Sequence, residues 1–342
     1  MRRYNATTKE KNTKPPGYLL DTLETTGYSP LSKSRQTLVR RTLAKATTLE
    51  NTFKLIDQKS PLEKQYWKTY HCGKELFQEG DKFTFLRCKK KWCRTCTNVR
   101  TANLINGYKH LLNDFQDSQL MVLTMKNCKG RQLKNTYTKM LEAFKLATRN
   151  VTKTHNLKIS GIRTWECTYN QETQEYHPHF NVVVESKEAA ELIRSYWLSY
   201  WTDRVGAKHV NTQAQFITPI SKSKDLLEVF KYVTKLAVSH DDETKAQDWI
   251  YQCTNGKRLA QAFGSLRKVK IEDKAIQEDI ILGESDIEIW IFEDEVKHYV
   301  NSHGETLVSD REKQEYINQK FREKKLREAE KERPPITLYQ PP

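Results

Sequence analysis

The middle of the chain alternates apolar and polar side chains in two consecutive runs, at residues 162–169 and 176–184. Between the runs, Asn170 to Gln174 has the composition of a turn. A repeat of two residues is typical of β-strands, so this stretch predicts an antiparallel hairpin. Residues 120–126 are apolar and β-branched, and they predict a further strand ahead of the hairpin.

Helical periodicity flanks the hairpin on both sides. The first predicted helix has an apolar face with Leu133, Tyr137, Met140, Leu141 and Phe144. The second has an apolar face with Leu192, Ile193, Tyr196, Trp197, Tyr200 and Trp201. A third helix is expected from about Lys224 to Ser239. Helices with one apolar face, combined with antiparallel strands, predict an α+β protein.

The two ends of the chain have weaker patterns. Residues 1–60 are polar, with scattered apolar positions, and are expected to form a loosely packed, partly disordered arm. Residues 287–292 alternate, which predicts a strand with one aliphatic and one mixed face. Residues 309–333 are densely charged, so an exposed helix is expected there, stopped by Pro334 and Pro335.

These patterns divide the chain into four regions. The expected regions are a basic N-terminal arm (1–68), a cysteine segment (69–105), a central domain (106–270) and a C-terminal strand and charged helix (271–342).

Composition narrows the class of partner. The 342 residues include 58 Lys and Arg against 43 Asp and Glu, for a formal net charge of +15. Such an excess favours a polyanion such as nucleic acid. No apolar run is long enough for a membrane span, and no secretory signal follows the N-terminus, so a cytoplasmic protein is expected.

Four of the seven cysteines are grouped with the spacing C-x15-C-x4-C-x2-C, namely Cys72, Cys88, Cys93 and Cys96. Four thiolates can close a tetrahedral zinc site, and in a reducing compartment such a group favours metal over disulfides. His71 could replace Cys72, and ordinary buried thiols are the alternative. Neighbouring lysines and arginines could also bind phosphate. The isolated Cys128, Cys167 and Cys253 are interpreted as structural, with Cys167 facing the core.

The hairpin has a predicted metal-binding face. With a four-residue loop from Gln171 to Gln174, Glu166 lies across from His179. Alternation then places two imidazoles, His177 and His179, on the same face as this carboxylate, while the other face is apolar. These ligands suit a divalent ion. A slip of one residue would move Glu166 to the apolar face, so the prediction depends on the register.

The predicted helix at 224–239 has a tyrosine on its polar face. Tyr232 shares that face with Glu228 and Lys235. A tyrosine hydroxyl is a poor nucleophile at its usual pKa of about 10, but a divalent ion on a phosphate would make the phosphorus more electrophilic. Lys235 could stabilise developing charge, and Glu228 could activate the hydroxyl or a water. A half-buried tyrosine beside a Glu–Lys pair is the alternative.

In combination, these motifs resemble the HUH endonucleases, and more narrowly the rolling-circle replication initiators of small bacterial plasmids. The resemblance spans roughly residues 70–270. Val122-Leu123-Thr124-Met125 looks like the first motif of the family, residues 175–180 like its metal motif and residues 228–235 like its tyrosine motif. The upstream cysteines and Gly256-Lys257-Arg258 are also similar to that branch.

The resemblance implies a five-stranded antiparallel sheet flanked by helices, with the histidine pair on a central strand. It implies that Tyr232 nicks the plasmid origin, single-stranded or extruded as a hairpin, with a 5′-phosphotyrosine and a free 3′-hydroxyl. In the single-tyrosine branch, the position of Glu228 is associated with the hydrolysis that ends replication. Many relatives have a third histidine where this chain has Asn181, so its part in the metal site is left open.

The expected cofactors are Mg²⁺ or Mn²⁺ at the nicking site and a structural Zn²⁺. The expected partners are origin DNA and a host helicase and polymerase, with no membrane, and a dimer is left open. A relaxase or single-strand transposase with the same chemistry is the nearest alternative. A non-catalytic zinc-dependent DNA-binding regulator is the alternative from another class.

Overall fold

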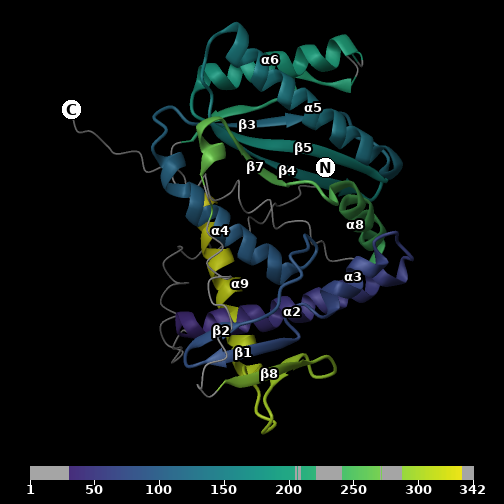
Figure 1. The fold of residues 1–342 in the computed structure, drawn as a ribbon, viewed down its shortest axis with the longest axis vertical. Coiled ribbons are helices and arrows are strands. Elements are labelled where there is room, and N and C mark those ends of the chain that lie inside the picture. The colour runs from purple at the N-terminus through teal and green to yellow at the C-terminus, as the bar shows by residue number, and fades with distance from the viewer. Residues whose placement is uncertain are drawn as a thin grey trace, which may run out of the picture. The chain divides into compact units, whose positions relative to one another are not determined.

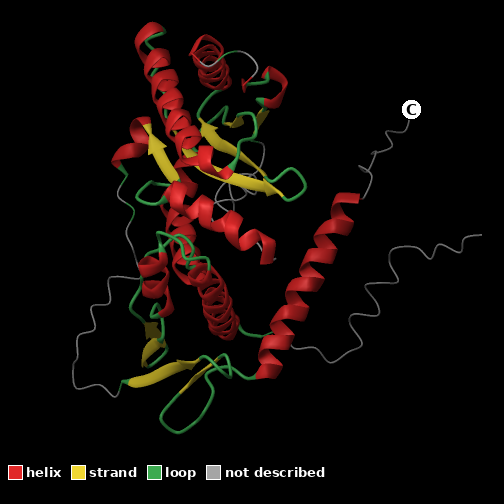
Figure 2. Ribbon diagram, turned by 90° about the vertical axis from the view of Figure 1, so that its right-hand side faces the viewer, coloured by secondary structure: helices red, strands yellow, loops and turns green. Residues whose placement is uncertain are grey.

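The computed structural model describes residues 31–204, 206, 209–220, 241–269, 271 and 287–332. These residues fall into two compact units, which are divided between Val39 and Arg40 and between Leu307 and Val308. The unit from 40 to 307 contains two separate β-sheets, seen as two groups of strands in Figure 2. Within the described part of the chain, no helix is both long and apolar enough to cross a membrane.

The central feature is a five-stranded sheet with the strand order β6-β3-β5-β4-β7 (Figure 1). Its strands are β3 (Gln119–Thr124), β4 (Gly161–Asn170), β5 (Glu175–Val184), β6 (Ile217–Pro219) and β7 (Ala260–Phe263). Every neighbouring pair is antiparallel. The predicted α+β class with a five-stranded antiparallel sheet is therefore confirmed, and β5, which carries the histidine pair, is the central strand.

One face of this sheet is apolar and is covered by α5 (Gly130–Thr154), α6 (Lys187–Arg204) and α8 (Asp241–Thr254). Trp165 of β4 and Phe180 of β5 are fully buried there. The ring of Tyr137 from α5 lies 4.5 Å from that of Trp165, between centroids. The two helical faces predicted from the sequence supply much of this core, including Leu133, Met140, Phe144, Ile193, Trp197 and Trp201. Cys167 also faces it, as predicted.

The opposite face of the sheet is covered in part by α4 (Arg94–Asn113). Tyr108 and Leu112 of this helix pack on Ile162 and Val183, at the end of the hairpin far from its turn. The short 3₁₀ helix η3 (Gly264–Lys268) adds Leu266 to the same cluster. Toward the turn, the face has polar residues instead, and these form the candidate site.

A second, four-stranded sheet has the order β2-β1-β8-β9. Its strands are β1 (Glu75–Glu79), β2 (Lys82–Thr84), β8 (Glu288–Glu293) and β9 (His298–Val300). The strand predicted at 287–292 is confirmed, and its buried side chains are Trp290 and Phe292, while Ile289 and Ile291 are exposed. β1 lies in the predicted cysteine segment (69–105), and β8 lies in the predicted C-terminal region (271–342). The two regions therefore contribute neighbouring strands to one sheet.

The loose packing expected for residues 1–60 is wrong for residues 33–57. They form α2 (Lys33–Asp57), which α3 (Glu63–Tyr70) follows. Polar residues are buried in α2 because they find backbone partners: Thr48 and Thr52 donate to carbonyls one turn back. Lys45 is 1% exposed and donates to the carbonyl oxygens of Tyr70 and Cys72. Burial lowers the pKa of Lys45 to about 8.

The charged helix predicted near the C-terminus is α9 (Asp310–Glu332), and most of its described residues are exposed or half-buried. Its start is a capping box, because the amide of Glu312 donates to the Ser309 hydroxyl and the Ser309 amide donates to the Glu312 carboxylate. Arg35 makes a two-pronged ion pair with the same carboxylate, at 2.6 and 2.7 Å.

Candidate functional site

The β4–β5 hairpin places the predicted metal ligands on one face. Asn170 pairs with Glu175 next to the turn, so Glu166 lies directly opposite His179. This is the register predicted from the four-residue loop. On the other side of β5, Thr124 of β3 is the neighbour of His179. His179 therefore has the Glu166 carboxylate on one neighbouring strand and Thr124 on the other.

Glu166 and His179 are in direct contact. Nε2 of His179 lies 3.1 Å from Oε2 of Glu166, and both side chains are largely buried. Asn181 donates its amide to the same carboxylate oxygen at 3.2 Å. Asn181, whose part in the site was left open by the sequence, is therefore placed to fix the orientation of Glu166.

The geometry around His179 suits a cation. Its Nδ1 lies 3.3 Å from the backbone carbonyl of His177, an acceptor. If the ring hydrogen is on Nδ1, the Nε2 lone pair faces a carboxylate oxygen, and a bound cation can join the two; with the hydrogen on Nε2, the same contact is an ordinary hydrogen bond to Glu166. Two neighbouring ligand atoms of an octahedral ion, each bonded at about 2.1 Å, lie about 3 Å apart. The separation of these two atoms fits that requirement.

His177 is half-buried on the same face but has another partner. Its Nε2 forms a short hydrogen bond with the hydroxyl of Thr124. Burial, and then the neighbouring His179, lower its pKa. The side chain of Gln215 brackets Thr124, accepting from its amide at 2.8 Å and donating to its carbonyl at 3.2 Å. His177 could join an ion at His179 and Glu166 only after its bond to Thr124 opens.

The structure thus brings together two of the three predicted divalent-ion ligands. Among the described residues, the cysteine group is the one set of three or more potential ligands whose donor atoms all lie within 4.8 Å of one another. The predicted helix at 224–239, with Tyr232, Glu228 and Lys235, lies outside the described residues.

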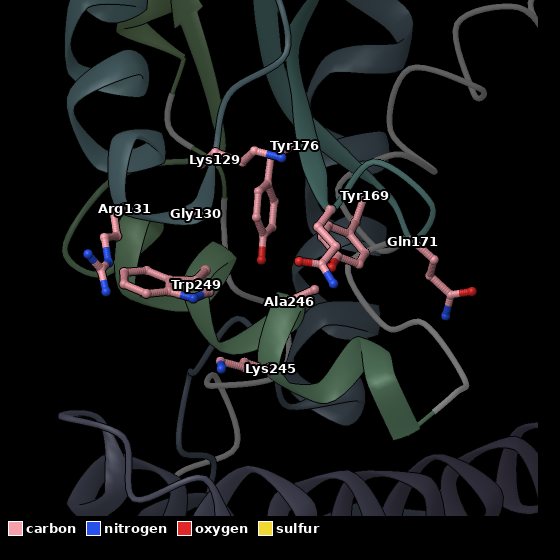
Figure 3. Close-up of a pocket in the computed structure, with 10 residues that line it drawn as sticks. Lys129, Gly130, Arg131, Tyr169, Gln171, Tyr176, Lys245, Ala246 and Trp249 are labelled. Atoms are coloured by element: carbon pink, nitrogen blue, oxygen red, sulfur yellow. The ribbon is translucent and has the colours of Figure 1, made fainter.

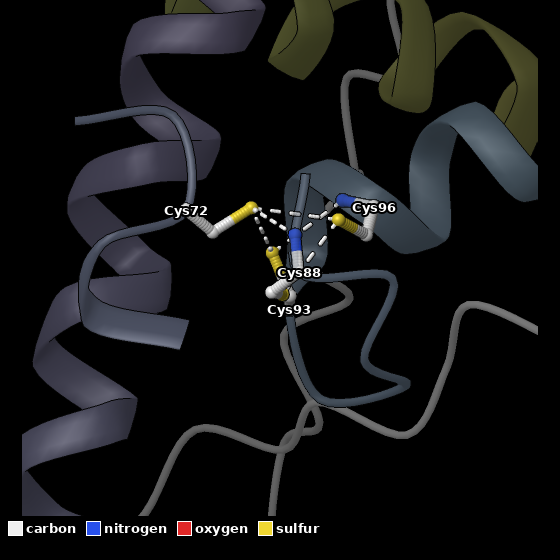
Figure 4. A group of neighbouring side chains, drawn as sticks. All are labelled: Cys72, Cys88, Cys93 and Cys96. Atoms are coloured by element: carbon white, nitrogen blue, oxygen red, sulfur yellow. Dashed lines mark hydrogen bonds between the residues drawn. The ribbon is translucent and has the colours of Figure 1, made fainter. Parts of the chain in front are cut away.

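The four cysteines form a second candidate metal centre (Figure 4). The Sγ atom of Cys72 lies 3.5 Å from that of Cys96 and 3.6 Å from that of Cys93, and the Sγ atoms of Cys88 and Cys96 are 3.8 Å apart. A zinc ion with tetrahedral bonds of about 2.3 Å would hold its sulfurs about 3.8 Å apart. His71 is exposed, so Cys72 and not His71 completes the group.

Backbone amides point at these sulfurs. The amide of Cys88 donates to Sγ of Cys72, and that of Cys96 donates to Sγ of Cys93, which is the N-cap of α4. Hydrogen bonds among the four thiols lower the pKa of Cys88, Cys72 first, and raise the pKa of Cys72 and of Cys93. Donors and a helix N-terminus both favour the thiolate, which is the form that binds metal. The spacing of the four sulfurs and the donors around them are those of a group that could hold a metal ion.

Three of the cations beside the cluster have structural partners, while Lys89 and Arg94 are exposed. The ammonium of Lys91 binds the backbone carbonyls of Thr254 and Lys257, and Arg100 donates to the carbonyl of Lys89. Lys90 donates to Gln65. Phosphate binding, which the sequence suggested for this group, would have to compete with these contacts at Lys90, Lys91 and Arg100.

Two residues of the candidate site on the hairpin face were missed by sequence reasoning. Thr124 ends β3 and was noted only as part of a motif, although alternation places it beside His179 once β3 and β5 are paired. Gln215 lies between the 3₁₀ helix η2 (Thr212–Ala214) and β6, where no local pattern singles it out. Its 2% exposure and its paired hydrogen bonds to Thr124 are visible only in the fold.

Comparison with known proteins gives a consistent family. The chain is 29% identical to a protein named Protein rep of Bacillus amyloliquefaciens, over 54% of this chain and 64% of the relative. It is 25% identical to a Protein rep of Staphylococcus aureus, over 43% of this chain and 69% of the relative. For the Protein rep of Streptococcus pneumoniae, the identity is 29% over 30% of this chain and 33% of the relative.

These alignments span between one third and about two thirds of the relatives' own lengths. No solved structure matches the chain significantly. A family model described as "Replication protein" matches residues 83–316, which is more than half of the chain. The chain therefore belongs to the Rep_1 family of replication proteins.

Proposed function

We propose that this protein initiates plasmid replication by the rolling-circle route, as a site- and strand-specific DNA endonuclease. The observation that carries the proposal is the contact of Glu166 with His179 on the central strand, beside His177. Two imidazoles and a carboxylate on one sheet face are a donor set for a divalent ion, and the protein is strongly basic. The relatives named Protein rep support the replication role.

His177, His179 and Glu166 would hold Mg²⁺ or Mn²⁺, which would polarise a DNA phosphate. The chain itself supplies the remaining steps. The hydroxyl of Tyr232 attacks phosphorus and the bond to the 3′ oxygen breaks. The 5′ phosphate stays on the tyrosine, and a 3′-hydroxyl is released as the primer. Lys235 stabilises the developing negative charge, and Glu228 accepts a proton from the attacking hydroxyl or, at termination, from a water.

Other residues position this chemistry. Asn181 holds the Glu166 carboxylate toward His179, and the His177 carbonyl fixes the ring orientation of His179. Gln215 holds Thr124 in place, and the Thr124 hydroxyl would have to leave Nε2 of His177 before that nitrogen joins the ion. We assign the nicking role to residues 106–270, and a zinc ion to Cys72, Cys88, Cys93 and Cys96. The proposed partners are origin DNA and the helicase and polymerase of the host, in the cytoplasm.

The direct test is strand cleavage of a labelled single-stranded oligonucleotide from the double-strand origin of the encoding plasmid. Cleavage should require added Mn²⁺ or Mg²⁺ and should be abolished by His177→Ala. The matched control is His303→Ala, since His303 is exposed and outside the site. Cleavage without any divalent ion, or by the His177→Ala variant, would rule out the metal-dependent mechanism.

The same gel separates the alternative functions. A non-catalytic zinc-dependent DNA-binding regulator would bind the oligonucleotide and leave it intact. A relaxase or single-strand transposase would cleave it by the same chemistry but would act on a transfer origin or a transposon end. Cleavage at the replication origin in preference to those sequences therefore supports the initiator.

A further inference from the structure

A cavity of about 680 Å³ lies at the turn end of the hairpin, on the sheet face opposite to the histidines. It lies among the turn end of the hairpin, the start of α5 and the helix α8 (Figure 3). Its volume is in the range of pockets that hold a nucleotide-sized ligand. No acidic residue is among the described residues that line it. None of the residues placed in the proposed chemistry lines it either.

Aromatic rings form much of its wall. Tyr169 and Tyr176 are cross-strand partners with ring centroids 4.9 Å apart. Figure 3 shows Trp249 and Tyr169 on opposite sides of the space into which the Tyr176 hydroxyl points. Trp249 lies against the backbone of Gly130, where an added Cβ would be only 2.9 Å from the indole. The glycine therefore lets the indole approach the first turn of α5 closely.

Cations line the same cavity. Arg131 and Lys245 are exposed, on α5 and α8. Lys129 also lines it, but its ammonium donates to the carbonyl of Thr173 and lies 3.6 Å from the carboxylate of Glu175. Among the described residues that line the cavity, the cations that offer most charge to a ligand are therefore Arg131 and Lys245. Together, the site offers rings for stacking and cations for phosphate.

We propose that this cavity binds an unpaired nucleotide of single-stranded DNA, with its base against Trp249 and Tyr169 and its phosphate near Arg131 and Lys245. Rings and cations in one groove are the general means of binding single strands without sequence preference. A paired base cannot present its faces to these rings, so the site selects unpaired DNA. This inference rests on the proposed function, because the DNA is the strand that the enzyme cleaves.

The placement gives the cavity a role in that reaction. Tyr176 and His177 are consecutive residues whose side chains lie on opposite faces of β5. A strand bound at the histidines would have to pass around the hairpin turn, so the nucleotide in the cavity would be one several positions along the same strand. Binding there would hold the strand single-stranded on one side of the phosphate that is cleaved.

The test measures binding of two fluorescent probes to the full chain carrying Tyr232→Phe, which prevents covalent attachment. One probe is a single-stranded thymidine oligonucleotide, and the other is an abasic backbone of the same length. Trp249→Leu should weaken binding of the thymidine probe by about 5-fold or more, because a stacked base contributes about 1–3 kcal/mol. It should leave the abasic probe unchanged, and Trp249→Phe should bind both as the parent does.

Charge reversal tests the phosphate side. The double variant Arg131→Glu/Lys245→Glu should weaken binding of both probes. The loss should be about 10-fold larger than that in the control double variant Lys139→Glu/Lys153→Glu. The second pair makes the same change of net charge at exposed α5 residues outside the cavity. Equal effects of the two pairs, or equal loss of both probes in Trp249→Leu, would overturn the proposal. Failure of the single-stranded probe to bind would overturn it as well.

The outcome is separable from the proposed function because these measurements need no cleavage. If the probes behave as expected but the wild-type chain never cleaves its origin, the nicking function fails and the cavity stands. If the chain cleaves but the cavity variants bind as the parent does, the cavity fails and the function stands.

Discussion

Glu166 lies directly across the β4–β5 pair from His179, and its carboxylate oxygen is 3.1 Å from Nε2 of that histidine. Because both side chains are largely buried, the charge of Glu166 is needed for a cation at this point. Glu166→Gln keeps the shape of the side chain and removes the charge. It should raise the Mn²⁺ concentration for half-maximal origin cleavage at least 10-fold. An unchanged Mn²⁺ dependence would exclude Glu166 as a ligand.

The hydrogen bond between Thr124 and His177 competes with metal binding at His177, and a substitution can measure this competition. The Thr124 hydroxyl occupies Nε2 of His177, and this hydrogen bond must open before that nitrogen can bind an ion. Thr124→Val removes the hydroxyl at nearly constant volume. Since a net hydrogen bond contributes about 1 kcal/mol, the Mn²⁺ dissociation constant should fall about 2- to 10-fold. Calorimetric titration with Mn²⁺, in chains that also carry Tyr232→Phe, measures this dissociation constant with and without Thr124→Val. Weaker Mn²⁺ binding in Thr124→Val would contradict the competition and would show that Thr124 supports the metal site.

The cysteine cluster should hold one metal ion per chain. Cys96→Ser should reduce zinc, measured by mass spectrometry of the purified protein, to below about one tenth of an ion. The melting temperature should fall by about 10 °C or more, because metal binding contributes directly to folding free energy. Cys128→Ser is the control, since Cys128 is buried outside the cluster. Full zinc content in Cys96→Ser would show that the four thiols are not the ligands.

Acid should uncouple the start of α9 from Arg35. The pKa of Glu312 is lowered from its ordinary 4.5 to about 2, and the hydrogen bonds from Arg35 are the largest cause. A carboxyl with a depressed pKa in the folded state stabilises the fold above pH 4.5, and this contribution disappears as the pH falls toward 2. Glu312→Gln should therefore melt below the wild type at pH 7, with a difference that shrinks below pH 4.5. A constant difference measured by circular dichroism across that range would contradict the ion pair.

The sequence was sufficient for the hairpin because its information is local. A four-residue loop sets the register, and alternation sets the face of each side chain. Both rules hold over a few residues, so the pairing of Glu166 with His179 could be predicted. The spacing of the four cysteines was similarly sufficient for their grouping, which the structure brings within 4.8 Å.

The remaining features depend on contacts between distant segments. β1 pairs with β8, which is far away in the chain, and no local pattern indicates this. α2 is rich in Lys and Thr and so resembles an unstructured arm, but its buried Lys45 donates to the carbonyl of Cys72, an acceptor that only the fold supplies. Gln215 reaches Thr124 for the same reason. Lys, Thr and Gln are mostly exposed in proteins, so their residue types alone give no reason to expect that they are buried here.

Covalent attachment of the chain to its origin strand tests the central claim most directly. The wild-type chain, incubated with Mn²⁺ and an origin oligonucleotide labelled 3′ of the nick, should give a band of slower mobility on a denaturing gel. Peptide mapping should place the attached phosphate on Tyr232. Tyr232→Phe should abolish the band, while Tyr316→Phe, a control outside the proposed site, should retain it. Attachment that persists in Tyr232→Phe, or maps to another residue, would contradict the proposed nicking mechanism.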